Sequence, residues 1–435
     1  MKAVFLTAGA AGMYCGSCMH DNALALAMRD QDVDCVLQPV YTPIRTDVES
    51  IASEQVFFGG IHIYLLQQLP WIRFVPGPLR RLLDWTPLIR MATSRVSSTD
   101  ATKLGELTLS MLAGSNGRQR DEVNRLVDWL EDDMKPDAIL LSNLLIGGAL
   151  PTIRQRLPKT KLAVLLQGDD IFLDFLPDHQ REEALRLCRE LVSSVDHFIV
   201  HSQFYADKMA AMLQIPADKI KVTPLSIDVK PFSKAVPDSH STNDSTDRFR
   251  LGFLARISPE KGLHLLVDSF LRLAEDEQHA DLDLHVAGWL GESNHGYLQQ
   301  QRDRIEVAGM SHRFHYHGSP DLDAKIEFLR SLHLLCVPTE YEEPKGLFVL
   351  EALAAGVPVV QPNHGAFPEL IERTAGGALV PPGDHEALAD SIAAMKSDPV
   401  LRKRHAQDGM ARVHAEHSIE TAARLMKSIL FGPSH

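Results

Sequence analysis

Residues 250–271 read RLGFLARISPEKGLHLLVDSFL, and this stretch indicates the fold class. Its first five residues form a short, mostly apolar run of the kind found in buried strands. A turn containing Pro259 and Gly262 follows. Apolar residues then recur three and four positions apart, which is the spacing of one face of a helix. A strand, a turn and a helix in direct succession are typical of an α/β protein.

The same alternation runs from one end of the 435-residue chain to the other, on both sides of a polar segment. A chain of this length is too long to fold around one hydrophobic core, so two domains of roughly 200 residues are expected. We predict an α/β fold with two Rossmann-like, doubly wound domains facing an interdomain cleft. The predicted strands are 2–7, 138–141, 162–166, 197–200, 250–254, 282–287, 334–337 and 357–360. The predicted boundaries are an N-terminal, acceptor-side domain over 1–235 with helical decoration over 69–135, a polar linker over 236–247, a C-terminal, donor-binding domain over 248–416, and a helix over 417–435 that packs back on the first domain.

Composition excludes several classes of protein. The net charge of −13 repels phosphate backbones, so nucleic acid is not an expected partner. Five cysteines in a chain this long do not make a disulfide scaffold. No apolar run reaches the roughly 18 residues that a membrane span needs. The start of the chain reads as a first strand rather than as a signal peptide, and we expect a cytoplasmic protein.

The stretch EPKGLFVLEALAAG at 343–356 is the strongest candidate for a functional site. Gly346 permits close backbone approach where a loop enters a helix, and the unpaired amides of the first turn can hold a phosphate. Glu343 and Glu351 then lie on either side of that phosphate, within reach of hydroxyl groups. The structural alternative is a capped helix with two surface carboxylates.

Arg256 and Lys261 form the second candidate, directly after the strand over 250–254. Two cations at the end of a strand and the start of a helix suit a diphosphate. In so acidic a protein they supply the local positive charge that an anionic ligand needs. Taken alone, such cations are usually solvated.

Together these two stretches resemble the family-four retaining glycosyltransferases of the GT-B fold, which are the nucleotide-sugar-dependent glycosyl transferases of group 1. The resemblance extends over nearly the whole chain and is strongest between about 250 and 390. It includes further motifs at 224–228 (PLSID), Gly288, 317–318 (HG), 365–369 (GAFPE) and 382–384 (PGD).

The resemblance implies a hexosyltransferase that moves a sugar from a nucleoside-diphosphate sugar to an acceptor hydroxyl with retention of configuration. In that family Arg256 and Lys261 grip the diphosphate, and Glu343 contacts the transferred sugar. Glu351 contacts the ribose, and the amides around Gly346 and Leu347 contact phosphate. The Gly-rich turn from Gly12 to Gly16 approaches the sugar, and loops at Gly288 and Gly318 lie against the base.

One departure concerns the turn at 167–170. Many family members have a His where this chain has Gln167, so Asp169 or Asp170 is expected to take part of that role toward sugar or acceptor. The structural alternative is an acidic turn that caps a helix. The acceptor, whether glycan, lipid or small molecule, is left open. Arginines in 69–135 either meet an anionic lipid head at a membrane surface or face water, and water is favoured. The oligomeric state is not determined by the sequence.

No metal and no cofactor are expected, because two cations and a helix dipole can stabilise the leaving diphosphate by preorganised electrostatics. The acidic triplets at 281–283 and 321–323 are of a length that arises by chance in an acidic chain. His312, His315 and His317 cluster, and the last two share one face of a strand. A buried or nucleotide-facing histidine is favoured there over a metal site.

Three other functions are compatible with parts of the sequence. Cys15 and Cys18 open a helix, as in a redox dithiol, but nothing else in the chain suits a thioredoxin-like domain. A dinucleotide-dependent oxidoreductase is not favoured, because this chain lacks a clear G-x-G-x-x-G motif followed by an acidic residue. A non-catalytic sugar-nucleotide-binding protein of the same fold is the remaining alternative.

Overall fold

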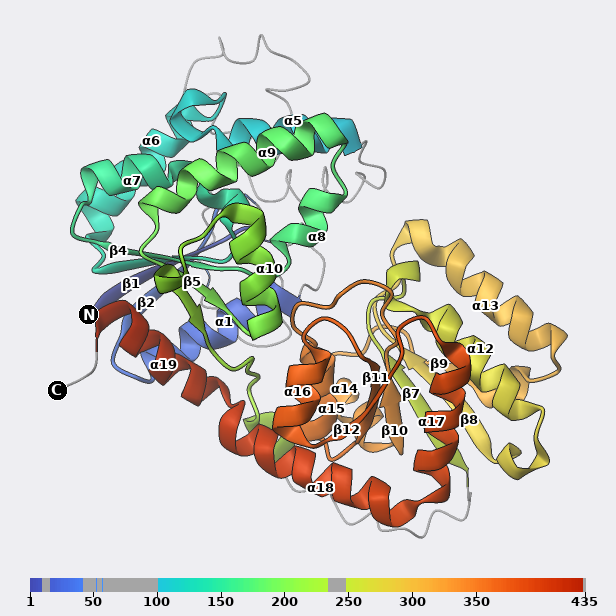
Figure 1. Cartoon of the computed structure of the whole chain (residues 1–435). Coiled ribbons are helices and arrows are strands. Elements are labelled where there is room, and N and C mark those ends of the chain that lie inside the picture. Colours follow the sequence, from blue (N-terminus) through green and yellow to red (C-terminus); the bar gives the residue numbers. More distant parts are fainter. Residues whose placement is uncertain (10–15, 42–51, 53–56, 58–100, 234–247, 433–435) are drawn as a thin grey trace. The chain divides into compact units, whose positions relative to one another are not determined.

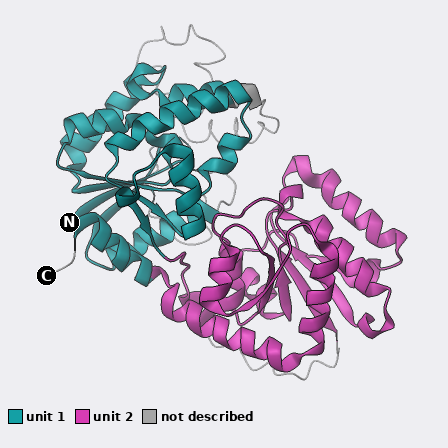
Figure 2. Ribbon diagram, in the orientation of Figure 1, with its two compact units in different colours: residues 1–223, 420–435 teal, residues 224–419 magenta. Residues whose placement is uncertain are grey.

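The computed structural model describes residues 1–9, 16–41, 52, 57, 101–233 and 248–432 (Figure 1). The chain divides into two compact units (Figure 2). Unit 1 comprises Met1–Thr223 and Glu420–His435, and unit 2 comprises Pro224–Ile419. The boundary at Thr223 precedes the predicted one, because residues 225–232 contribute side chains to the hydrophobic core of unit 2. The predicted linker over 236–247 lies outside the described residues.

Unit 1 is built on a parallel sheet whose strand order is β2-β1-β3-β4-β5-β6. Its central strands β1, β3, β4 and β5 are buried nearly throughout, as expected for a parallel sheet covered on both faces. Helices α5, α6, α7 and α9 lie along one face of this sheet, and α1 and α19 lie along the other (Figure 1). The strands are β1 (Lys2–Thr7), β2 (Asp34–Pro39), β3 (Ala138–Leu141), β4 (Lys161–Leu165), β5 (His197–Val200) and β6 (Ile220–Val222). The helices are α1 (Gly16–Arg29), α5 (Ala101–Leu112), α6 (Arg120–Trp129), α7 (Leu150–Arg156), α8 (Asp169–Asp174), α9 (Asp178–Leu191), α10 (Gln203–Leu213) and α19 (Ile419–Phe431).

The predicted helical decoration over 69–135 is described only from residue 101 onward. There α5 and α6 are helical, and α5 packs against α9. Residues 69–100, with the arginines that raised the question of a lipid surface, lie outside the described residues.

Unit 2 is built on a second parallel sheet, with the order β12-β11-β10-β7-β8-β9. Its helices form two packed groups, one of α12 with α13 and α17, the other of α15 with α14 and α18. The strands are β7 (Phe249–Leu254), β8 (Leu282–Ala287), β9 (Phe314–Tyr316), β10 (Leu334–Cys336), β11 (Val359–Pro362) and β12 (Gly377–Val380). The helices are α11 (Lys230–Ser233), α12 (Leu263–Ala274), α13 (His295–Val307), α14 (Leu322–Arg330), α15 (Leu347–Ala354), α16 (Phe367–Thr374), α17 (His385–Ser397) and α18 (Pro399–Glu416).

The predicted fold class is therefore confirmed: each unit is a doubly wound, Rossmann-like α/β unit with six strands among the described residues. Chain order along each sheet reverses at one point, between β1 and β3 in unit 1 and between β7 and β10 in unit 2. In doubly wound sheets, ligands bind outside the carboxyl ends of the strands at such a point. The fold thus directs attention to the loops that follow β7 and β10.

Candidate functional site

The loops after β7 and β10 carry the residues that the sequence marks most strongly. Arg256 and Lys261 lie between β7 and α12, and Glu343 lies between β10 and α15. Because β7 and β10 are hydrogen-bonded neighbours, two loops about 80 residues apart in the chain meet at the switch point of unit 2.

Glycines hold the loop after β7 in place. Gly262 has a φ of 75° and ends the short turn before α12, and a Cβ there would lie 1.8 Å from the carbonyl oxygen of Pro338. Gly288 has a φ of 145°, and a Cβ there would lie 1.7 Å from the carbonyl oxygen of Ala255. Only glycine fits such contacts at positive φ, so both positions are fixed by the approach of neighbouring backbone.

Lys261, Tyr341 and Glu343 form a hydrogen-bonded triangle. The Lys261 Nζ lies 2.7 Å from Glu343 Oε2 and also donates to the Tyr341 hydroxyl. That hydroxyl donates in turn to Glu343 Oε2 at 2.6 Å. The Glu343 side chain is 8% exposed and the Lys261 side chain 14%, so the ion pair is largely removed from water.

Both acidic groups of the triangle have shifted pKa values. Burial and the neighbouring Glu343 carboxylate raise the pKa of Tyr341, so its hydroxyl stays protonated and donates. Burial alone would raise the pKa of Glu343, but the charge and hydrogen bond of Lys261, with the bond from Tyr341, hold it below its ordinary value. The site therefore contains a buried, ionised carboxylate beside a lysine. Nζ carries three donors, and two of them have partners among the described residues.

Arg256 lies at the edge of this network. Its Nη2 is 2.6 Å from Glu260 Oε1, and its side chain is half exposed. Burial and the Glu343 charge raise the pKa of Tyr341, and the Arg256 charge acts in the opposite direction. Arg256 is therefore close enough to interact electrostatically with the triangle. The structure brings Lys261 and Glu343 into contact, and it leaves Arg256 nearby in an exposed ion pair of its own.

Helix α15 begins directly beyond Glu343. Gly346 precedes it with a φ of 83°, and no side chain caps its first turn. The Val349 N–H donates to the Gly346 carbonyl at 2.9 Å. The N–H groups of Leu347 and Phe348 precede the first hydrogen bond of the helix, at the positive end of its dipole. The predicted helix start thus lies directly after Glu343 in the chain, and its binding of phosphate stays a prediction.

Glu351 lies one turn into α15 and pairs with a lysine that sequence reasoning did not assign. The Lys325 Nζ is 2.7 Å from Glu351 Oε1, and both side chains are mostly buried. A carboxylate has further acceptor positions besides this one, so Glu351 can still accept a hydroxyl.

Two predicted donor-side glycines lie after β8 and β9. The Gly288 backbone N–H donates to the Gly318 carbonyl at 2.8 Å, and the Tyr316 hydroxyl donates to the Gly288 carbonyl at 3.1 Å. The predicted contact from unit 1 is described only in part, since Gly16 begins α1 whereas Gly12 and Cys15 lie outside the described residues. Cys18, in the first turn of α1, is buried.

The predicted acceptor-side residues follow β4 in unit 1 and are buried. The Gln167 Nε2 donates to Asp21 Oδ1 and to the Ser142 carbonyl, both at 3.0 Å. Asp170 accepts from the Tyr205 hydroxyl at 2.7 Å and pairs with Lys208 at 2.9 Å. These contacts attach the turn to α1, to the end of β3 and to α10.

Asp169 accepts two backbone N–H groups, from Leu144 at 2.7 Å and from Gln167 at 3.1 Å. Burial nevertheless raises its pKa to about 6, because the desolvation outweighs the two hydrogen bonds. Its contacts hold the loops after β3 and β4 together, and a role toward an acceptor stays a prediction.

Besides Lys325, sequence reasoning did not assign Tyr341, Lys345 and Asp21. Tyr341 and Lys345 flank Glu343, and Lys345 is buried with a charge that helps to lower the pKa of Glu343. Lys345 lies within the strongest motif and Tyr341 stands two residues before it, which is a signal that could have found them. Asp21 is fully buried and accepts from the Thr7 hydroxyl at 3.0 Å, and no motif marks it.

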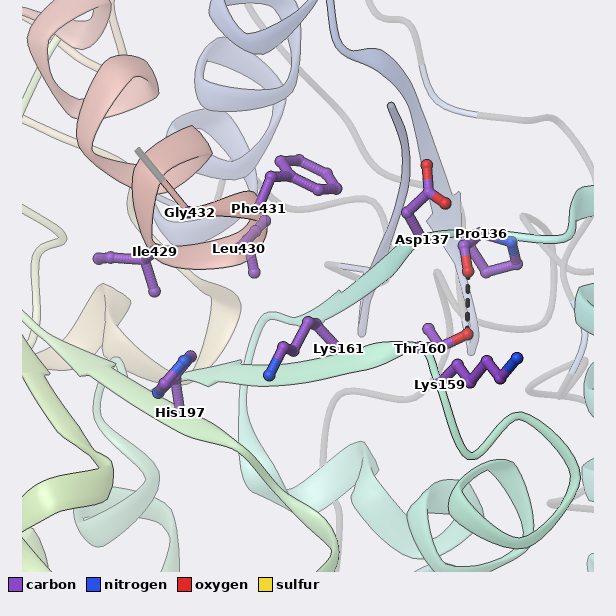
Figure 3. Close-up of a pocket in the computed structure, with 10 residues that line it drawn as sticks. All are labelled: Pro136, Asp137, Lys159, Thr160, Lys161, His197, Ile429, Leu430, Phe431 and Gly432. Carbon is purple, nitrogen blue, oxygen red and sulfur yellow. Dashed lines mark hydrogen bonds between the residues drawn. The ribbon is translucent and has the colours of Figure 1, made fainter. Parts of the chain in front are cut away.

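A separate cavity of about 560 Å³ lies at the opposite edge of the unit 1 sheet (Figure 3). Lys161 and His197 begin β4 and β5 there, whereas the candidate residues of unit 1 follow the carboxyl end of β4. None of the predicted site residues lines this cavity. Its lining residues are Pro136, Asp137, Lys159, Thr160, Lys161, His197, Ile429, Leu430, Phe431 and Gly432. Among the helices that the structure describes, none combines the length and the apolar character needed to cross a bilayer.

Comparison with known proteins bears on these sites. Residues 237–412 match the family described as "Glycosyl transferases group 1". The chain is 28% identical over 227 residues to the lipopolysaccharide core biosynthesis mannosyltransferase LpcC of Rhizobium leguminosarum, covering 52% of this chain and 62% of that protein. It is 31% identical over 176 residues to a phosphatidyl-myo-inositol mannosyltransferase of Mycobacterium leprae, covering 40% of this chain and 44% of the relative. These matches thus cover less than two thirds of each relative's length.

Solved structures match over nearly the whole chain. A sucrose-phosphate synthase of Thermosynechococcus elongatus aligns with a TM-score of 0.69 at 17% identity, covering 99% of this chain and 98% of the other. HepE of Anabaena in complex with UDP aligns with a TM-score of 0.66 at 19% identity, covering 99% of both chains. At such identities the likeness concerns the fold. Residues 237–412 are therefore similar to the group 1 glycosyltransferases, and the chain has the fold of the GT-B glycosyltransferases among the solved structures.

Proposed function

We propose that this protein transfers a sugar from a nucleoside-diphosphate sugar to an acceptor hydroxyl, with retention of anomeric configuration and without a metal in the reaction. The observation that carries the proposal is the buried Lys261–Glu343 pair beside the start of α15, at the switch point of unit 2. The proposed activity rests on unit 2, where the family match lies.

The charges of the site suit the reaction. Breaking a sugar–phosphate bond builds negative charge on the leaving diphosphate and positive charge on the anomeric carbon. Lys261, Arg256 and the amides at Leu347 would stabilise the diphosphate, and the ionised Glu343 would lie toward the sugar. The Glu351 carboxylate would accept the ribose hydroxyls.

The contacts that the structure gives for the acidic triplets are ion pairs and a helix cap that do not involve Lys261 or Glu343, which favours a sugar transfer without a metal. Asp281 pairs with Lys396 at 2.8 Å, and Asp283 forms two hydrogen bonds with Arg248 at 2.6 Å. Asp321 caps α14 by accepting from the Ala324 N–H at 3.0 Å.

The donor class is supported by solved structures, since HepE structures are described in complex with UDP and with UDP-glucose. The family match gives no support to the dinucleotide-dependent oxidoreductase. The base, the sugar and the acceptor are not specified by the described residues, and the cytoplasmic location remains a prediction from the sequence.

The experiment begins with a thermal-shift screen of nucleoside diphosphates and sugar nucleotides, because a ligand that binds the folded state raises the melting temperature. Transfer or hydrolysis of the selected donor is then measured in excess EDTA. We expect full activity in EDTA, and NMR of the product should show the donor's anomeric configuration. Activity that disappears with EDTA and returns with Mg²⁺ or Mn²⁺ would refute the metal-free reaction.

Glu343→Gln separates an enzyme from a sugar-nucleotide-binding protein without catalysis. The substitution keeps the shape of the side chain and removes its charge. An enzyme should lose most of its turnover while the donor still raises the melting temperature. A binding protein would have no turnover to lose, and a wild-type protein that binds the donor but never hydrolyses or transfers it would support that alternative.

A further inference from the structure

A cluster of histidines and one aspartate lies on one face of the unit 2 sheet, on its last two strands. His285 in β8 is paired in register with His315 in β9, the edge strand. Asp283 precedes His285 by two residues and so lies on the same face. Ligand atoms of these three side chains lie within 4.8 Å of one another.

His285 is held in one orientation with an unused nitrogen. Its Nδ1 lies 3.0 Å from the His317 Nε2, and the two rings stack at 5.3 Å. Its Nε2 is buried and has no hydrogen-bond partner among the described residues. When Nδ1 donates to His317, Nε2 carries a lone pair, and a buried lone pair without a partner is what a metal ion satisfies.

The carboxylate of the cluster is also held in a fixed orientation. Arg248 binds both oxygens of Asp283 at 2.6 Å and fixes that carboxylate, which retains acceptor positions on each oxygen. The Asp283 Oδ2 lies 3.9 Å from the His315 Nε2.

We propose that Asp283, His285 and His315 bind one divalent transition-metal ion of the Zn²⁺ class, with His317 orienting His285 through its second ring nitrogen. Two imidazoles and a carboxylate are a common donor set for zinc, with bonds of about 2.0–2.2 Å. A histidine ligand usually donates its other N–H to such an outer partner. This site is separate from the sugar transfer, in which no metal takes part.

The bound ion would join β8 to the edge strand. β9 has three residues and one neighbouring strand, so a metal shared by the paired residues His285 and His315 would fix that edge. The loops that carry Gly288 and Gly318 begin directly beyond these strands, and the ion would steady them as well.

Two cations near the site repel a bound metal ion. Arg248 pairs with both oxygens of Asp283 and holds that carboxylate in place. Arg250 in β7 is paired in register with Asp283 and gives a sharper test. Replacing Arg250 with glutamine should therefore tighten metal binding.

The experiment titrates the full-length, metal-stripped protein with Zn²⁺ by calorimetry and with Co²⁺ by visible absorption. Wild-type protein should bind one ion per chain at this site, and Zn²⁺ should raise its melting temperature. His285→Gln and His315→Gln should remove this binding, and His317→Gln should weaken it about 10–100-fold. The matched control is His312→Gln, an exposed histidine next to β9, which should bind as the wild type does.

The outcomes distinguish the proposal from adventitious binding. Binding that is equal in the wild type, His315→Gln and His312→Gln, or no binding at all, would refute the site. Because His315 is 41% exposed at its side chain, its substitution should leave the fold intact, and apo melting temperatures check this. Weaker binding by Arg250→Gln would also contradict the proposed geometry.

Discussion

The Lys261–Glu343 pair shows how one buried contact can serve both stability and chemistry. A buried charge is costly unless it is paired, and each partner of this pair satisfies the other in the absence of ligand. In the proposed reaction, a diphosphate bound by Lys261 would compete with Glu343 for the same ammonium group. Ligand binding would then redistribute an existing interaction instead of creating a new one.

Replacing Lys261 with methionine tests this at the level of one residue. We expect kcat to fall about 10²–10³-fold, because one preorganised donor to the leaving diphosphate is lost. The variant should also lose up to about 3–5 kcal/mol in the free energy of unfolding, because Glu343 is left without its cation. Arg272→Met is the matched control, since Arg272 lies on α12 in an exposed pair with Asp390. Unchanged kcat in a folded Lys261→Met protein would contradict the assignment.

The raised pKa of Asp169 predicts that the free energy of unfolding depends on pH. Its pKa is raised by burial from 3.8 to about 6 in the folded protein, so the folded state binds the proton more tightly. Its contribution is then most favourable below pH 4 and is lost as the pH rises through 6, by about 3 kcal/mol in all. The other titrating groups contribute equally to both proteins, so their effect cancels when the free energies of unfolding of the wild type and a variant are compared at each pH.

Asp169→Asn should therefore destabilise the protein more at pH 4 than at pH 7. The amide keeps one acceptor for the two backbone N–H groups and never becomes charged. Urea unfolding of both proteins at several pH values measures the difference. A penalty that is constant between pH 4 and 7 would show that Asp169 does not titrate in this range.

At the scale of elements, the turn between β7 and α12 places Lys261. Gly262→Ala would bring a Cβ to 1.8 Å from the Pro338 carbonyl at a positive φ. We expect a loss of at least about 1–3 kcal/mol, because a strained backbone adds to the clash. Gly296→Ala is the matched control. That glycine lies in α13 with open space around its Cβ position, so the change should stabilise the protein by about 0.5–1 kcal/mol. Chemical denaturation compares the two, and equal effects would mean that the turn is not constrained.

The sequence predicted the long, strongly apolar elements well. β1, β3, β5 and β8 have the predicted bounds, and β7 differs from its prediction by one residue. It did not mark β2, β6 and β12 as strands. In the described parts of the chain, β6 and β12 are short, terminal strands of their sheets. β6 has no fully buried residue and β12 has one. Apolar periodicity reports burial, so elements that are half covered leave little trace in it.

The sequence predicted several residues of the candidate site but not the contacts between them. Glycine and charge at loop–helix junctions marked Lys261, Gly346 and Glu343. Their meeting depends on the order of strands in the sheet, which apolar spacing does not encode. The partners Lys325 and Glu260 are lysine and glutamate residues of ordinary appearance, and only the coordinates show what they contact.

At the scale of the whole molecule, the chain passes between its units twice, near Thr223 and near Ile419. The two passages are hydrogen-bonded together: the Ile227 N–H donates to the His417 carbonyl, and the Ile419 N–H donates to the Ile227 carbonyl, both at 2.9 Å. Helix α19 then packs in unit 1, where the Lys427 Nζ donates to the Gln31 carbonyl at 2.7 Å.

The contribution of α19 can be measured with two neighbouring residues. Met426 is 3% exposed and Leu425 is 39% exposed. Met426→Ala should cost about 2–5 kcal/mol through the lost burial and the cavity left behind, whereas Leu425→Ala should change stability by less than about 0.5 kcal/mol. Hydrogen exchange measured by mass spectrometry should show the loss of protection in peptides of unit 1. Loss confined to unit 2 would contradict the assignment of this helix.

The position of α19 also has a consequence for biosynthesis. A ribosome that has finished residue 223 must still make all of residues 224–419 before residues 420–435 appear. At roughly 5–20 residues per second this takes about 10–40 s. During that time the nascent N-terminal part lacks its last helix, and the apolar surface meant for Ala423, Met426 and Leu430 is open to chaperones.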